Sequence, residues 1–182
     1  MAYGIQGAFM DPRATASHFH LHEGDIVADF GAGTGSYLKI LSELVGTSGC
    51  VYACEIQKSH VDEMNTFIKK ERLSNVRPLW CDLEAVHGTK LGDGVLDAGI
   101  LVNTLFQIEE KEKALQEIAR VMHKGAKLIL IDWTDSFGGM GPLATEVFTK
   151  EKAQTLLTRS GFEYVRDFPA GDHHYGLAFR RV

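Results

Sequence analysis

Three glycines that follow a short apolar run give this sequence its first indication of a binding site. Gly31, Gly33 and Gly35 come directly after the run 26–30, and an amphipathic segment begins at Ser36. Glycine allows a sharp turn and lets the backbone approach a ligand closely, and a following helix directs free N–H groups at the same place. The dinucleotide pattern G-x-G-x-x-G requires glycine where Ser36 stands. A purely structural turn is the alternative.

Polar residues end the next three predicted strands. Glu55 ends the second strand, and an acidic side chain there can accept both hydroxyl hydrogens of a ribose; the alternative is a solvated carboxylate. Asp82 and Leu83 follow the third strand, where a carboxylate can accept from an exocyclic adenine amine and a backbone N–H can reach the ring. Asn103 follows the fourth strand. Together these residues predict a pocket for an adenosine that carries a charged tail.

The elements that must position these residues alternate between strand and helix. Apolar runs bounded by turn residues predict strands at 26–30, 50–55, 76–81, 95–102 and 127–133. The N-cap Asp11 followed by proline predicts a helix at 11–21, and helical patterns predict helices at 36–45, 58–72, 109–122 and 149–160. Two further strands, 162–168 and 174–180, are joined by a link too short for a parallel crossover, so they form an antiparallel hairpin. This alternation predicts a doubly wound α/β sheet, whose ligands bind outside the carboxyl ends of its strands.

Composition excludes several classes of protein. The 182 residues, with 45% apolar and 24% charged residues, fit a single globular domain over 1–182. The formal charge of −5 and the pI of about 5.9 disfavour nonspecific binding to nucleic acid. No apolar run is long enough to span a membrane. The first residues lack the basic start and apolar run of a signal peptide, so we expect a cytoplasmic protein.

The glycine segment 27–35, together with Glu55, the Asp82–Leu83 pair, Asn103 and the terminal hairpin, resembles the class I S-adenosylmethionine-dependent methyltransferases. Within that superfamily the chain is most similar to small methyltransferases related to the ubiquinone/menaquinone C-methyltransferases. Segments that carry this closer similarity are 103–107, 124–126, 131–133 and 173–177. The resemblance covers almost the whole chain from about residue 9. The quinone enzymes are longer, so a shared substrate does not follow.

The resemblance implies a Rossmann-like, seven-stranded sheet in the order 3-2-1-4-5-7-6 and S-adenosyl-L-methionine as the cofactor. It implies that the three glycines line the methionine part, that Glu55 holds the ribose, and that Asp82 and Leu83 hold the adenine. Asn103 would touch the methionine end through its backbone. The expected cofactor-binding residues are Asp29, Phe30, Gly31, Ala32, Gly33, Gly35, Glu55, Ile56, Asp82, Leu83 and Asn103.

The catalytic residues are less well indicated. A sulfonium-bound methyl group is already electrophilic, so the protein mainly has to align a nucleophile with it. A general base is needed only if the nucleophile holds a proton at pH 7. The candidates are His173, His174 and Asp132, with Asp135 and Tyr175 nearby; surface or structural roles are the alternative for each.

We expect no metal site. His18, His20 and His22 alternate before the first strand, and exposed alternate positions explain that spacing. The three cysteines are read as reduced, buried thiols. Cys50 and Cys54 lie four residues apart in a predicted strand, too far apart to share a metal.

Three segments remain for recognising a substrate: the N-terminal helical segment 1–22, expected to cover the site, the loop 134–148, expected to act as a lid or substrate wall, and the hairpin turn. The favoured function is methyl transfer to a small molecule. The first alternative is an RNA or protein methyltransferase, acting alone or with a partner subunit. The second is a non-catalytic cofactor-binding module. A nicotinamide enzyme is disfavoured by Ser36.

Overall fold

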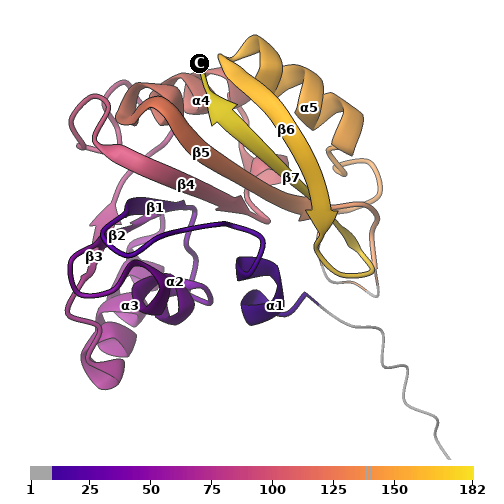
Figure 1. Cartoon of the computed structure of the whole chain (residues 1–182). Helices are drawn as coiled ribbons and strands as arrows, with labels where there is room; N and C mark the ends of the chain where they lie inside the picture. Colours follow the sequence, from indigo (N-terminus) through magenta and orange to yellow (C-terminus); the bar gives the residue numbers. More distant parts are fainter. Residues whose placement is uncertain (1–9, 138, 140) are drawn as a thin grey trace, which may run out of the picture.

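A seven-stranded sheet forms the centre of the molecule, with the strand order β3-β2-β1-β4-β5-β7-β6 (Figure 1). The computed structural model describes residues 10–137, 139 and 141–182. The strands are β1 (Ile26–Phe30), β2 (Cys50–Glu55), β3 (Val76–Trp80), β4 (Leu96–Val102), β5 (Met122–Trp133), β6 (Phe162–Pro169) and β7 (His174–Arg181). This is the order implied by the resemblance, and the predicted fold class is confirmed.

The strands β1 to β5 are mutually parallel, and β7 is antiparallel to both of its neighbours. Only residues 170–173 separate β6 from β7, which is too short for a parallel crossover. The predicted C-terminal hairpin is therefore confirmed. Because the five parallel strands point the same way, their carboxyl ends share one edge of the sheet, where the polar residues of the sequence gather.

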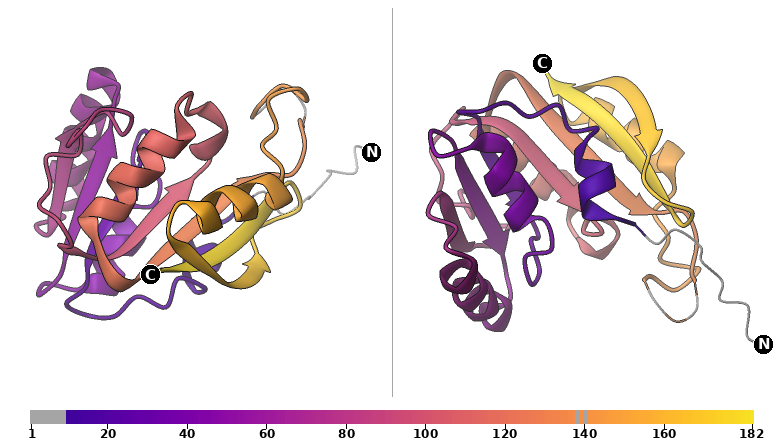
Figure 2. Two further views of the ribbon diagram at one scale, coloured as in Figure 1. Left: turned by 90° about the horizontal axis from the view of Figure 1, so that it is seen from above. Right: turned by 60° about the horizontal axis from the view of Figure 1, so that its bottom comes forward.

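Helices cover both faces of the sheet, as Figures 1 and 2 show. They are α1 (Pro12–Ala16), α2 (Leu38–Val45), α3 (Lys58–Glu71), α4 (Lys111–Val121) and α5 (Lys150–Arg159), with a 3₁₀ turn η1 at Leu105–Gln107. One apolar cluster joins the sheet to α4 and α5 through residues such as Ile118 and Leu157. A second cluster joins the opposite face to α1, α2 and α3 through residues such as Leu41 and Met64. Each helix thus buries the apolar stripe that its periodicity predicted.

The first helix is shorter than the predicted range 11–21, because α1 ends at Ala16. His20 then adopts a left-handed backbone conformation with φ of 51°, which a continuing α-helix does not allow. Phe19 is fully buried there, and its ring packs against Tyr37 and Phe168. Tertiary packing of one aromatic side chain therefore overrides the local helical pattern.

The fifth strand is longer than the predicted range 127–133 and begins at Met122. Met122 pairs with Leu96 before an irregularity in the ladder, and regular pairing resumes where Lys127 lies opposite Ala98. The helix predicted over 109–122 correspondingly ends at Val121. The other boundaries differ from the predicted ones by one or two residues, as helix and strand ends commonly do.

The segment α1 is fastened to the start of α2. Thr15 Oγ1 and Tyr37 Oη share a buried hydrogen bond of 2.7 Å, and Arg13 pairs with Glu43 at 2.9 Å.

Two segments expected to shape the site are described only in part. Of the segment 1–22, residues 1–9 lie outside the described part. In the loop 134–148, residues 138 and 140 lie outside it, and Gly141 lies against the indole of Trp133. That the segment 1–22 covers the site and that the loop 134–148 acts as a lid or substrate wall stay predictions, as does the single domain over 1–182.

Among the described residues, no helix combines the length and apolar character that crossing a bilayer requires. The cytoplasmic location stays a prediction.

A buried carboxylate fixes the long loop between β3 and β4. Glu117 on α4 accepts hydrogen bonds from the backbone N–H of Thr89 (3.0 Å) and from its hydroxyl (2.6 Å). Arg120 pairs with Glu117 at 2.7 Å and donates to the carbonyl oxygen of Leu91. The side chain of Glu117 is only 5% exposed, so these partners replace the water that its charge has lost. The loop that follows β3 is thereby tied to α4.

We predict that Glu117→Ala lowers the free energy of unfolding by about 3 kcal/mol, because it leaves Arg120 and two Thr89 donors without their buried acceptor. Urea denaturation followed by circular dichroism measures this loss. Gln116→Ala, an exposed neighbour on the same helix, is the matched control. Equal stability of the two variants would show that the carboxylate does not hold the loop.

Candidate functional site

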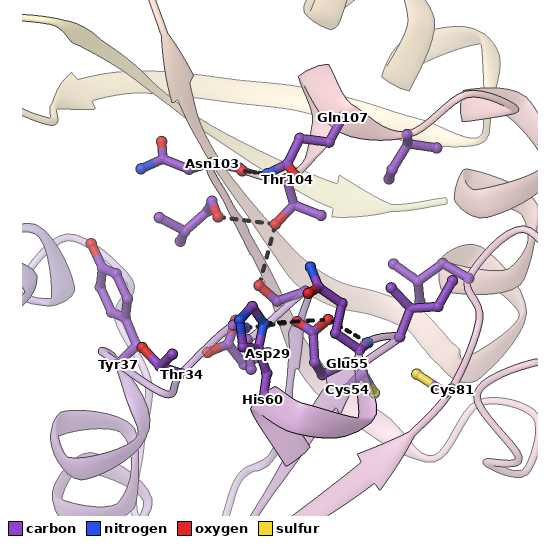
Figure 3. Close-up of a pocket in the computed structure, with 18 of the residues that line it drawn as sticks. Asp29, Thr34, Tyr37, Cys54, Glu55, His60, Cys81, Asn103, Thr104 and Gln107 are labelled. Carbon is purple, nitrogen blue, oxygen red and sulfur yellow. Dashed lines mark hydrogen bonds and ion pairs between the residues drawn. The ribbon is translucent and has the colours of Figure 1, made fainter. Parts of the chain in front are cut away.

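A cavity of about 520 Å³ opens at the carboxyl edge of the sheet. Its walls come from the ends of β1, β2, β3 and β4 and from the segments that follow these strands (Figure 3). The structure brings together nine of the eleven expected cofactor-binding residues in this wall, namely Asp29, Gly31, Ala32, Gly33, Glu55, Ile56, Asp82, Leu83 and Asn103. Glu55 and Asp82, which lie 27 positions apart in the chain, thus line the same cavity.

Phe30 and Gly35 do not line the cavity. Phe30 is fully buried in the core, where its ring occupies the space beside Gly99. Gly35 has φ of +93°, and a Cβ atom there would lie 2.7 Å from the side chain of Leu38. Its glycine is required by the turn and by the close approach of α2.

The glycine loop is held to β2 by its own backbone. The N–H groups of Gly31 and Ala32 both donate to the carbonyl oxygen of Cys54, each at 2.9 Å. Gly31 has φ of +80°, and a Cβ atom there would lie 2.5 Å from the side chain of Thr104. Gly33 has φ of +56° but open space where a side chain would begin. The loop therefore presents bare backbone to the cavity at Gly33.

The carboxylate of Glu55 is fixed by two amides. Its Oε2 accepts from Gly33 N (2.9 Å) and its Oε1 accepts from Gln57 N (2.8 Å). Nδ1 of His60 lies 3.9 Å from Oε1, and the Glu55 side chain is 7% exposed. Each carboxylate oxygen has a second lone pair, so Glu55 can still accept from a ligand while it holds the loop.

The cavity is strongly acidic. The described lining contains the carboxylates of Asp29, Glu55, Asp82, Glu84 and Glu109 and neither lysine nor arginine. Burial, and secondly the negative charge of Glu55, raise the pKa of Asp29 to about 7. A ligand that brings positive charge into this space would favour ionised Asp29.

Two carboxylates, those of Asp82 and Glu84, hold the loop after β3 through hydrogen bonds from backbone amides. Asp82 Oδ1 accepts from the backbone N–H of Glu84 (2.9 Å). The carboxylate of Glu84 accepts in turn from Glu109 N (3.2 Å) and Glu110 N (2.7 Å) just before α4. Asp82 and Leu83 are thereby set against the wall of the cavity.

Asn103 is the cavity residue with the least ordinary conformation. Its φ is +53°, a left-handed value that is uncommon outside glycine. Its backbone N–H donates to Ile131 O (2.9 Å) and its carbonyl oxygen accepts from Gln107 Nε2 (2.8 Å). Oδ1 is buried with no hydrogen-bond partner among the described residues. The buried Oδ1 therefore does not reach the open space of the cavity, whereas the backbone carbonyl oxygen keeps one lone pair for a ligand.

The three catalytic candidates do not belong to the described lining of the cavity. Asp132 is fully buried, and its carboxylate accepts from Phe106 N (3.0 Å) and Trp133 N (2.9 Å). Burial raises the pKa of Asp132 to about 6, although these amides act against the rise. Asp132 is therefore a buried carboxylate that holds η1 in place through the backbone N–H of Phe106.

His174 and His173 start the last strand at the same edge. His174 is 6% exposed and its ring packs on Trp133; burial lowers its pKa. Nδ1 of His173 lies 3.0 and 3.1 Å from the two carboxylate oxygens of Asp135, and its ring stacks on Phe137 at 3.8 Å. The Asp135–His173 pair thus joins the loop after β5 to the hairpin turn.

The histidines before β1 diverge. His18 stacks on Phe168, while His22 lies 3.7 Å from Asp25. No cluster of three or more metal-ligating side chains occurs within residues 10–137, 139 and 141–182. Cys54 and Cys81 are free thiols buried in the cavity wall, and Cys50 is partly exposed.

Several lining residues were not predicted from the sequence as site residues. Tyr37, His60, Thr104 and Gln107 lie in the first turns that follow a strand or the glycine loop. Their common signal is position, because the first turn after a parallel strand opens at the ligand edge. Which side chain of such a turn faces the cavity depends on the helix rotation, which the sequence alone does not fix.

Residues 28–130, more than half of the chain, match the family described as methyltransferase domain. The chain belongs to this family. A solved structure of an S-adenosylmethionine-dependent methyltransferase from Aquifex aeolicus superposes with a TM-score of 0.88 and is 30% identical, over 96% of this chain and 91% of that one. The methyltransferase domain therefore has the class I fold that the glycine loop and strand order indicated.

The chain aligns with only part of the length of two curated relatives. The ubiquinone/menaquinone biosynthesis C-methyltransferase of Francisella tularensis subsp. tularensis is 24% identical over 86% of this methyltransferase domain chain and 60% of the relative. The tRNA (carboxymethyluridine(34)-5-O)-methyltransferase of Xenopus tropicalis is 31% identical over 62% of this chain and 16% of the relative. The chain thus spans less than two thirds of either relative.

We predict that the free energy of unfolding decreases between pH 6 and pH 8 by about 1 kcal/mol more in the wild type than in Asp29→Asn. The reason is that the native carboxyl, with a pKa of about 7, keeps a proton that the unfolded chain releases near pH 4. This stability is present at low pH and is lost as the pH rises through 7.

Urea denaturation at several pH values measures the difference between the two proteins. Other titrating groups, Asp132 among them, are common to both and cancel in the comparison. Parallel pH profiles would contradict the raised pKa of Asp29.

Proposed function

We propose that the chain is an S-adenosyl-L-methionine-dependent methyltransferase that transfers the methyl group to a small-molecule acceptor. The observation that carries the proposal is one cavity in which a glycine loop, an amide-fixed Glu55 and the Asp82–Leu83 pair meet at the carboxyl ends of four parallel strands. The family membership supports the reaction class. The similarity to a quinone C-methyltransferase supports a small-molecule acceptor.

The residues of the cavity fit a cationic adenosine derivative. Glu55 offers free lone pairs to the ribose hydroxyls, and Asp82 with the backbone of Leu83 offers an acceptor and a donor to the adenine. The backbone carbonyl oxygen of Asn103 and the carboxyl group of Asp29 suit the ammonium group of a methionine tail. The absence of lysine and arginine from the described lining favours a net positive ligand over a dinucleotide with two phosphates.

A bound sulfonium supplies an electrophilic methyl group, so the residues of the chain have mainly to bind, orient and exclude water. The glycine loop and Glu55 form one hydrogen-bonded unit, which holds the ribose contact in register with the rest of the wall. Correct placement of a nucleophile is itself worth several kcal/mol of barrier. The loop 134–148 and α1 are proposed as the walls that shape the acceptor space.

His173 is the candidate base that the surroundings favour. Its side chain is 22% exposed, and Asp135 fixes Nδ1, which leaves Nε2 to exchange a proton. Asp132 and His174 are more deeply enclosed, so they are proposed as supports of the edge.

The RNA alternative rests on one observation, the 31% identity to a segment of a tRNA methyltransferase. The acidic cavity and the net charge of −5 count against binding of RNA by this chain alone, so this alternative needs a partner that supplies basic surface.

Methyl transfer from labelled cofactor into a cell extract tests the proposal. Label in a small-molecule fraction is the expected result, and the control is the same protein with Glu55→Ala. If nuclease or protease digestion removes the label from its fraction, the methyl acceptor is RNA or protein and not a small molecule. No transfer to any fraction, with the cofactor bound, would favour a non-catalytic module.

We predict that calorimetry detects micromolar binding of S-adenosylhomocysteine and none of NAD, and that Glu55→Ala weakens the former ten- to hundredfold. The loss of a charged acceptor costs about 1.5–3 kcal/mol. Glu63→Ala, an exposed carboxylate on α3, is the control. Tighter binding of NAD than of S-adenosylhomocysteine would end the methyltransferase proposal.

We predict that His173→Ala lowers kcat at least tenfold and leaves the affinity for S-adenosylhomocysteine unchanged, because a base acts on the acceptor and not on the adenosine. Asp135→Asn should reduce kcat in the same direction but less, since it only loosens the ring. A changed affinity with unchanged kcat would assign His173 a structural role.

A further inference from the structure

One titratable side chain of the cavity has no part in the function proposed above. His60 lies in the first turn of α3, lines the cavity and faces Glu55 (Figure 3). Its Nδ1 is buried, has no hydrogen-bond partner among the described residues, and lies 3.9 Å from Glu55 Oε1, which is beyond hydrogen-bond reach. The side chain as a whole is 30% exposed, so another part of the ring meets open space.

The position of the carboxylate decides which ring nitrogen is available. Glu55 cannot turn toward His60, because amides of Gly33 and Gln57 hold its two oxygens. Its negative charge favours the imidazole tautomer that carries the proton on the near nitrogen, Nδ1. Nε2 is then an acceptor with a free lone pair, on the side of the ring away from the buried nitrogen.

Glu55 and His60 thus offer two acceptors side by side in one wall. The amides of Gly33 and Gln57 already occupy one lone pair on each oxygen of Glu55, so His60 adds a further acceptor for the two adjacent hydroxyl groups that a ribose presents. We propose that His60, through Nε2, accepts a hydrogen bond from one ribose hydroxyl while Glu55 accepts from the other. This assignment rests on the proposed function, because it takes the adenosine of the cofactor as the ligand.

A binding experiment with S-adenosylhomocysteine and its 2′-deoxy and 3′-deoxy analogues tests the assignment by calorimetry on the full chain. His60→Ala is expected to weaken S-adenosylhomocysteine about tenfold, the effect of one neutral hydrogen bond. For one of the two deoxy analogues the wild type and His60→Ala should bind equally, because the hydroxyl that His60 contacts is already missing.

His60→Gln is the rescue variant, because its amide oxygen can reach the place of Nε2, and it should recover most of the affinity. Glu63→Ala, an exposed position on the same helix, is the matched control and should change nothing. His60→Gln also keeps the test informative if His60→Ala fails to fold: it should then bind the two deoxy analogues with unequal losses relative to the parent ligand.

Two results would overturn the assignment. If His60→Ala binds S-adenosylhomocysteine as tightly as the wild type does, His60 makes no contact with the ligand. An equal loss for the parent ligand and both deoxy analogues shows that His60 only supports Glu55. In both cases the wild type still binds S-adenosylhomocysteine, and the proposed function stands. Absence of binding by the wild type would instead overturn the proposed function, and the assignment with it.

Discussion

The hydrogen bond from Gly33 N to Glu55 Oε2 connects the two halves of the site. The glycine loop follows β1 and the carboxylate ends β2, so this bond continues the contact between the two strands beyond their ladder. Together with the two amides that bind Cys54 O, this bond sets the height of the loop above the sheet edge. Three neighbouring parts of the wall adjoin this unit: Thr104 packs on Gly31, Tyr37 follows the loop into α2, and His60 lies across from Glu55.

An acidic cavity carries a cost in the absence of ligand. Carboxylates from β1, from β2 and from the segments that follow β3 and η1 line one space of about 520 Å³, and burial raises the pKa of Asp29 to about 7. The repulsion is tolerated because backbone amides stabilise these carboxylates: Glu55 and Asp82 each accept from an amide two residues along the chain, and Glu84 accepts from the amide of Glu110 just before α4. A cationic ligand gains affinity in proportion as it relieves this repulsion, so the same charges that reduce stability serve recognition.

Much of this arrangement follows from patterns that the sequence displays openly. Apolar runs and helical periodicity predicted every strand and the five α-helices, because a parallel sheet requires continuous apolar strands and amphipathic covers. Glu55, Asp82 and Asn103 were predicted as neighbours since strand ends share an edge. Phe30 and Gly35 were placed with the ligand from their proximity in sequence, but strand alternation turns Phe30 into the core and the turn uses Gly35. His60 and the orphaned Asn103 Oδ1 depend on helix rotation and on one left-handed backbone angle, which no local pattern reports.

The contact between Gly31 and Thr104 bears on how this wall can vary. Two constraints act independently on position 31, since a side chain there would meet Thr104 at 2.5 Å and would also have to adopt a φ of +80°. Trimming residue 104 removes the first constraint and leaves the second. Variation of the two positions is therefore one-sided: residue 104 can shrink while glycine is retained at 31, but no second-site change at 104 makes a larger residue at 31 comfortable. Redesign of the cavity wall therefore has more freedom at 104 than at the glycine loop that residue 104 packs against.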